Sequence, residues 1–116
     1  MQTLTIIKGD TLNIPIVNLL PNKTRLNISG YKFFFTMKKK FDDDDDDDSA
    51  VFKKSWTTHS NANQGETILT VSSSETSTFD VGSYYADVKW INNSNLVKTP
   101  AIFNLIVINK VTNRTV

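Results

Sequence analysis

Apolar and polar residues alternate along most of this chain, a pattern typical of β-strands that bury one face. In the stretch 84–90 every second residue is apolar or aromatic, and the residues between them are Tyr85, Asp87 and Lys89. The stretch 31–39 alternates in the same way and places Phe33 and Phe35 on one face. The same signal, bounded by turn residues, predicts strands over 3–8, 11–17, 31–39, 50–56, 66–71, 84–90 and 96–109.

The segment 72–80 is too short and too polar for a full helix. Its serine and threonine side chains can bond to the nearby backbone, so one helical turn is the most that we expect there. The chain then reaches a glycine turn, Gly82-Ser83-Tyr84, where the strand pattern resumes. A strand that crosses to another strand through such a corner is typical of a sandwich edge and not of a hairpin.

Turn signals recur about every 8 to 12 residues, and no helix of normal length and no repeat is predicted. Seven to eight short strands in 116 residues indicate an all-β fold, an antiparallel β-sandwich in a single domain that spans 1–116. A barrel of the oligonucleotide-binding type is the alternative, but it has fewer and longer strands and a helix. Pro15 cannot donate to a strand ladder, so its strand is predicted at an edge or at a bulge.

The last strand is apolar on both faces. Ile102, Ile106 and Ile108 share one face, and Phe103, Leu105 and Val107 lie on the other. Because the outer face of a two-layer sandwich meets water, a second apolar face needs a cover. The cover is either a binding partner or a loop such as 18–30. Phe34 lies among lysines and a threonine, and we predict that it is part of the same partner-binding surface.

The charge of the chain is divided unevenly. Seven of the 12 acidic residues form the run Asp42 to Asp48, which leaves 5 acidic against 13 basic residues elsewhere. The run is interpreted as a solvated hairpin tip, as a contact for a basic partner, or as a weak cation site. It lacks the spaced ligands, glycine and final glutamate of an EF-hand. The metal candidates are Asp42, Asp44, Asp46 and Asp48, and the partner-binding candidates are Asp43, Asp45 and Asp47.

Few residues offer catalytic chemistry. The chain has no cysteine, and its one histidine, His59, lies in a polar loop where a solvated side chain is expected. No phosphate-binding glycine loop, metal-spaced cluster or separated carboxylate pair occurs in the sequence. We therefore expect no enzyme, no catalytic residue and no cofactor. Scattered lysines without interleaved aromatics argue against nucleic acid. Neither a signal peptide nor a membrane span is expected.

Three segments together resemble one protein family. They are Ile6 to Pro15, Ser29 to Lys39 and Ser73 to Val88, which read IIKGDTLNIP, SGYKFFFTMKK and SSETSTFDVGSYYADV, with an acidic stretch after the second. Their order is similar to that in the N-terminal immunoglobulin-like domain of phage upper baseplate proteins. The resemblance implies an immunoglobulin-like β-sandwich that mediates virion assembly without catalysis. The expected partners are other virion structural proteins in a multi-copy assembly.

The resemblance leaves the place in the particle open. A tail or baseplate subunit is expected first, and a capsid or neck decoration protein of the same fold is the alternative. A carbohydrate- or host-surface-binding module would need exposed aromatic rings on one face, for which Trp56 and Tyr85 are the candidates. An accessory protein outside the virion is a further alternative. The expected location is the virion, assembled in the cytoplasm of the host bacterium.

Overall fold

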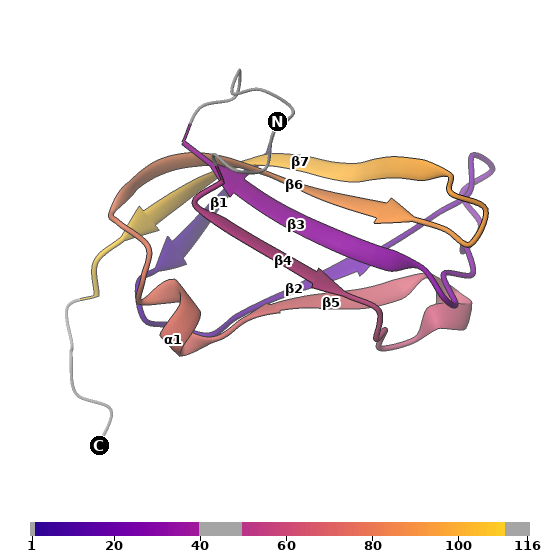
Figure 1. Ribbon diagram of the computed structural model, residues 1–116, viewed down its shortest axis with the longest axis horizontal. Helices are drawn as coiled ribbons and strands as arrows, with labels where there is room; N and C mark the ends of the chain where they lie inside the picture. Colours follow the sequence, from indigo (N-terminus) through magenta and orange to yellow (C-terminus); the bar gives the residue numbers. More distant parts are fainter. Residues whose placement is uncertain (1, 40–49, 111–116) are drawn as a thin grey trace.

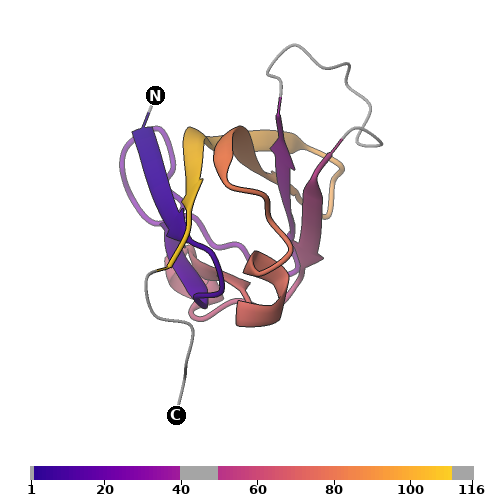
Figure 2. The ribbon, with the colours of Figure 1, turned by 90° about the vertical axis from the view of Figure 1, so that its left-hand side faces the viewer.

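The alternating pattern forms strands that assemble into two packed sheets (Figures 1 and 2). The structure is a computed structural model, and it describes residues 2–39 and 50–110. In this part of the chain the strands are β1 (Gln2–Ile7), β2 (Leu12–Val17), β3 (Lys32–Lys38), β4 (Phe52–Trp56), β5 (Glu66–Val71), β6 (Gly82–Ile91) and β7 (Val97–Ile108). Two short helical turns accompany them, η2 (Ala62–Gln64) and α1 (Ser73–Thr76).

The strand order identifies the kind of sandwich. One sheet has the order β1-β7-β6-β3-β4, and the other consists of β2 and β5. Strands β7, β6, β3 and β4 follow the G-F-C-C′ order of immunoglobulin domains, and β2 with β5 corresponds to the B-E pair. Every pairing is antiparallel except that of β1 with β7, which is parallel. The prediction of an all-β, immunoglobulin-like sandwich is confirmed, with one parallel pair that the sequence did not indicate.

The core lies between the sheets and is rich in aromatic side chains. Phe33 and Phe35 of β3 are fully buried in one hydrophobic cluster with Leu105 of the same sheet and Leu69 of the opposite sheet. Burying each phenylalanine stabilises the fold by about 1.5–3 kcal/mol relative to leaving it in water. Since the inward residues of β7 are used in this core, its other apolar face is left to point outward.

The corner before β6, where the Gly-x-Tyr pattern lies, is held by a side-chain hydrogen bond. The hydroxyl of Tyr84 donates a hydrogen bond to the main-chain carbonyl of Asp80. This is the tyrosine corner of immunoglobulin-like domains. Ala86 stands two residues later, where antibody domains carry a cysteine, so the corner here is held without a disulfide.

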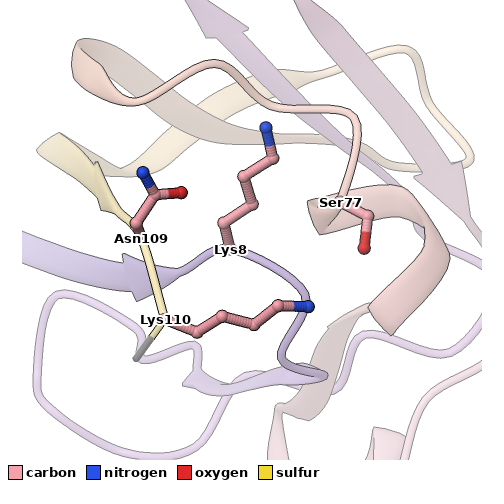
Figure 3. A pocket seen from close by; sticks show the side chains of 4 residues that line it. All are labelled: Lys8, Ser77, Asn109 and Lys110. Carbon is pink, nitrogen blue, oxygen red and sulfur yellow. The ribbon is translucent and has the colours of Figure 1, made fainter. Parts of the chain in front are cut away.

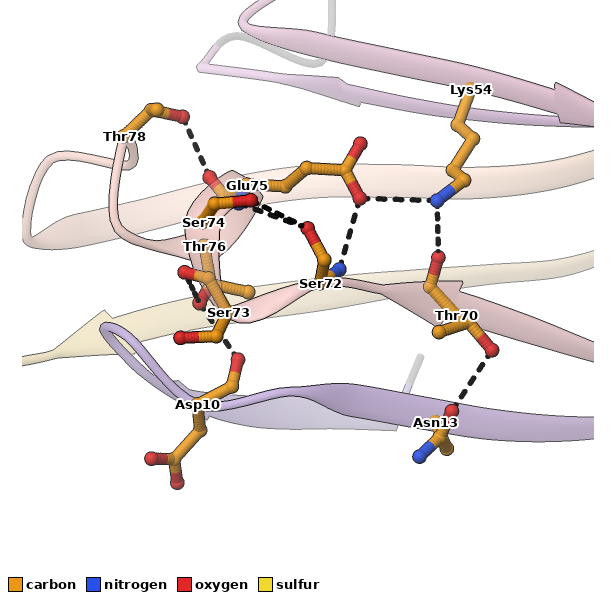
Figure 4. Close-up of polar contacts among 10 residues, drawn as sticks. All are labelled: Asp10, Asn13, Lys54, Thr70, Ser72, Ser73, Ser74, Glu75, Thr76 and Thr78. Atoms are coloured by element: carbon orange, nitrogen blue, oxygen red, sulfur yellow. Dashed lines mark hydrogen bonds and ion pairs between the residues drawn. The ribbon is translucent and has the colours of Figure 1, made fainter. Parts of the chain in front are cut away.

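The helical turn α1 links three parts of the fold (Figure 4). Ser72 and Glu75 form a reciprocal capping box, in which each side chain bonds to the other's main-chain N–H. The buried Thr76 hydroxyl donates to the carbonyl of Asp10 in the β1–β2 turn at 2.7 Å. On the other side, Lys54 of β4 lies 3.1 Å from the Glu75 carboxylate. One helical turn is therefore what the polar segment forms, as predicted.

The prediction for Pro15 is confirmed, and Pro100 also lies where a missing N–H is tolerated. Pro15 lies in β2, which pairs only with β5 among the described strands, so Pro15 is on a sheet edge. In β7 the register shifts by one residue, because Val88 pairs with Ala101 whereas Trp90 pairs with Lys98. The extra residue falls at Thr99-Pro100, where a bulge removes the need for a ladder donor.

Candidate protein-binding face

The outer face of the five-stranded sheet has no second layer over it among the described strands. Residues paired across neighbouring strands project from the same face of a sheet. The register of β7 with its two neighbours therefore defines what stands beside each exposed isoleucine. Ile102 lies opposite Asp87, and Ile106 lies opposite Ser83 on one side and Thr5 on the other.

The three isoleucines predicted as partner-binding do project from this face. Ile102 is 47% exposed and Ile108 is 41% exposed, whereas Ile106 is half-buried. The residues between them in β7, Phe103, Leu105 and Val107, are buried in the core. The inward apolar residues of β7 are therefore explained by the core. No described residue covers its outward isoleucines.

Ile7 joins this group, and the sequence analysis missed it. It lies directly opposite Ile108 in the parallel β1–β7 pair and is 39% exposed. Only the pairing of the two ends of the chain brings these residues together, so a local pattern could not reveal it. We name the set Ile7, Ile102, Ile106 and Ile108 the isoleucine face.

Phe34 lies on the same side of the sheet but is separated from the isoleucine face. It pairs with Lys89 of β6, and its half-buried ring has the ammonium group of Lys32 at 5.3 Å from the ring centroid. The polar residues Asp87 and Lys89 of β6 stand between it and Ile102. Phe34 is therefore a neighbour of the isoleucine face, packed under a cation, and not one continuous patch with it.

The loop 18–30 does not cover this face, so that alternative is wrong. Leu26 N donates to Asn18 O within the loop, and Ile28 N donates to Ala62 O in the turn before β5, both at 3.0 Å. Ile28 is fully buried there. A Cβ on Gly65 would lie 2.5 Å from Asn18 O, so only glycine allows this close packing.

Trp56 and Tyr85, the candidates for a sugar-binding platform, lie on opposite faces of the sheet. Trp56 stacks on the buried Phe33 with ring centroids 5.5 Å apart, and its indole N–H donates to Thr67 Oγ1. Tyr85 is on the outer face, where it pairs with Asn104. The two rings therefore do not form one platform, and the reason for favouring a carbohydrate site is lost.

His59 is not the solvated loop side chain that was expected. It is half-buried beside Phe33, and its Nε2 lies 3.0 Å from the Tyr31 carbonyl oxygen. A carbonyl can only accept, so Nε2 carries the proton. Its Nδ1 lies 3.0 Å from Thr67 Oγ1, whose hydroxyl then donates to it. Both ring nitrogens are engaged in structure, which leaves neither available as a catalytic base.

The acidic run Asp42 to Asp48 lies outside the described residues, and so do its metal and partner candidates. Lys54, in the strand that follows the run, is bonded to other residues. Lys54 Nζ donates to the Thr70 carbonyl at 2.6 Å and to Glu75 Oε1 at 3.1 Å, towards the β2–β5 sheet (Figure 4). The backbone N–H of Ser72 and then the Lys54 ammonium hold the pKa of Glu75 below its usual value.

A shallow cavity of about 500 Å³ lies at the end of β1 and β7 (Figure 3). Lys8, Ser77, Asn109 and Lys110 line it. The ammonium groups of the two lysines point in different directions, so they do not converge on one anion. Within the described ranges no group of three or more metal-ligating side chains occurs, and no helix is long and apolar enough to cross a membrane.

Comparison with known proteins adds no family to this geometry. No protein-family model matches the chain, and no curated protein matches it.

Proposed function

We propose that this chain is a non-enzymatic structural subunit of a tailed-phage virion, in which it joins neighbouring proteins of the tail or baseplate. The resemblance of its three segments to the phage upper baseplate family is the reason for proposing a phage particle. The isoleucine face is the proposed binding surface for the neighbouring protein, and its exposure is the observation that carries the proposal. The partner is another structural protein of the same particle that presents an apolar patch.

The chemistry of the isoleucine face suits a protein partner. Exposed β-branched side chains on a flat, rigid sheet offer apolar area with little side-chain entropy to lose on binding. Asp87, Lys89 and Lys38 border the face on β6 and β3 and supply a polar rim. An apolar centre with a polar border is the usual composition of a protein–protein interface.

Photo-crosslinking inside assembled particles tests this proposal. A photoreactive amino acid is placed at position 102 on the isoleucine face, and in a matched variant at position 68. Ile68 is a suitable control because it is equally exposed, at 43%, but lies on the other sheet. We expect position 102 to form adducts with a different structural protein and position 68 to form none. Adducts from position 68 alone would contradict the assigned face.

The same adducts locate the protein in the particle. A crosslink to a tail or baseplate protein supports the first assignment, whereas a crosslink to the capsid or neck supports the decoration alternative.

A further inference from the structure

The first strand, β1, forms one edge of the five-stranded sheet. Among the described residues it pairs only with β7. Lys8 N donates to Ile108 O at 2.8 Å at the end of this parallel ladder. Alternate residues of a strand bond to the same neighbour in such a ladder, so the even-numbered residues of β1 direct their N–H and C=O groups at β7.

The odd-numbered residues of β1 direct their backbone N–H and C=O groups to the side opposite β7. Thr3 and Thr5 are exposed, and their backbone N–H and C=O groups point away from β7 along the free edge. Ile7 does the same with its N–H, while its carbonyl accepts a hydrogen bond from Asp10 N at 3.0 Å. The free edge of β1 therefore presents a short row of backbone donors and acceptors.

The other strand edges in the described part of the chain carry features that oppose pairing. Pro15 lies in the middle of β2 and supplies no N–H. At the edge of β5 the Thr70 carbonyl is occupied by Lys54, and Glu66 is bridged to Asn61. The edge strand β4 carries consecutive lysines. Proline, lysine and covering contacts are the usual means of protecting sheet edges, and β1 has none of them.

Charge favours a second copy of this chain as the partner of β1. The chain has 13 basic and 12 acidic residues, so a second copy brings almost no net charge to the pair. The stretch Gln2–Ile7 contains no charged side chain. Two antiparallel β1 strands would therefore meet without repulsion within the paired residues.

We propose that β1 pairs antiparallel with β1 of a second copy across a two-fold axis at Thr5. In this register Thr5 faces Thr5 of the other copy, and Thr3 faces Ile7, so the outward N–H and C=O groups of each copy meet acceptors and donors of the other. Opposed threonines are a favourable cross-strand pair. The two five-stranded sheets become one continuous sheet. The inference concerns the isolated protein and holds whether or not the protein is part of a virion.

Sedimentation velocity over a wide concentration range tests the pairing with two variants of one residue. Thr5→Pro removes the outward N–H, which the β7 ladder does not use, so the fold is retained. Thr5→Ala keeps that N–H and is the matched control. We expect wild type and Thr5→Ala to dimerise alike. Thr5→Pro should raise the dissociation constant about tenfold or more, equivalent to about 1.4 kcal/mol. A monomer at every concentration, or a dimer insensitive to Thr5→Pro, would overturn the proposal.

Amide hydrogen exchange of the wild-type protein gives a second readout that does not depend on the folding of Thr5→Pro. The N–H groups of Thr3, Thr5 and Ile7 should exchange more slowly as protein concentration rises, whereas those of Leu4 and Ile6, already bonded to β7, should not change. Exchange rates of Thr3 and Thr5 that are independent of concentration would overturn the proposal.

Discussion

Ile7 and Ile108 lie directly opposite each other on the parallel strands β1 and β7, and both side chains are exposed on the outer face of the sheet. They belong to opposite ends of the chain. Their inward neighbours Ile6 and Val107 are buried in the core, so the two strands cannot turn over to hide the exposed pair. The fold therefore holds this apolar surface in place on the outer face of the sheet.

Replacing exposed isoleucines by threonine should weaken assembly without weakening the fold. In the double variant Ile102→Thr, Ile108→Thr, the β-branched shape is kept and apolar area is lost. We expect the free energy of unfolding to change by no more than about 1 kcal/mol and incorporation into particles to fall severalfold. Quantitative immunoblotting of purified particles measures incorporation. Ile68→Thr, on the other sheet, is the control, and an equal loss in that variant would contradict the assigned face.

The hydrogen bond of the tyrosine corner should be visible in stability and in its pH dependence. Tyr84→Phe should lower the free energy of unfolding at neutral pH by about 1–2 kcal/mol. Burial, and then the charge of Asp80, raise the pKa of Tyr84. The bond therefore stabilises the fold below the ordinary phenol pKa of about 10 and is lost as pH rises through the folded value. Urea denaturation of both proteins at neutral and alkaline pH tests this, and a constant difference would contradict it.

Local patterns were sufficient to predict the strands and their buried faces. The period of two in β6 and β7 fixes which residues are inside, because one face of each strand must meet the core. Contacts between distant segments were not predictable in this way. The parallel β1–β7 pair, and with it Ile7, depends on joining residues 2–7 to residues 103–108, and nothing within either segment specifies that pairing.

The candidate site shows the same division. The outward direction of Ile102 and Ile108 follows from alternation alone. The setting of His59 does not, because its partner Tyr31 is 28 residues away in the chain. Trp56 was named as a candidate for an exposed sugar-binding ring. However, Lys54 turns towards Glu75 and the β2–β5 sheet, and Trp56, two residues along on the same face, turns inward with it.

The capping box at α1 should give the protein a dependence on acidic pH. Since the pKa of Glu75 is lowered in the folded state, ionised Glu75 stabilises the fold above the ordinary value of 4.5, and this stabilisation is lost as pH falls through the folded value. Glu75→Gln keeps a side chain that can complete the capping box but removes the charge. We expect wild type to be more stable than this variant by roughly 0.2–1 kcal/mol at neutral pH.

Thermal or urea unfolding of both proteins between neutral pH and pH values below the folded pKa measures that difference. The two stabilities should converge at the acidic end. A difference that persists there would show that the charge of Glu75 is not its cause.

His59 should act as a structural residue. His59→Ala removes the hydrogen bonds to Tyr31 and Thr67 and leaves the buried Thr67 hydroxyl with one partner fewer. We expect a loss of about 1–3 kcal/mol in the free energy of unfolding. Ser60→Ala, next to it and exposed, should have an effect near zero. Equal stability of His59→Ala and wild type would mean that the bonded arrangement contributes nothing in solution.

The acidic run should influence the rate of assembly more than the stability of the fold. Replacing Asp42 to Asp48 by alternating serine and glycine should lower incorporation into particles at low salt, and this loss should shrink as salt screens the charge. Incorporation is measured over a salt series, with urea unfolding as the control for folding. Incorporation that is unchanged at every salt concentration would contradict a partner contact and favour the interpretation of the run as a solvated hairpin tip.

The most direct test of the account is quantitative mass spectrometry of purified particles of the phage that we propose encodes this chain. We predict that the protein is present at a fixed ratio to the tail and baseplate proteins, and that the ratio survives washing and density-gradient purification. A fixed ratio to the major capsid protein instead would favour the decoration alternative. Absence from purified particles would contradict the virion-subunit proposal and favour an accessory protein outside the particle.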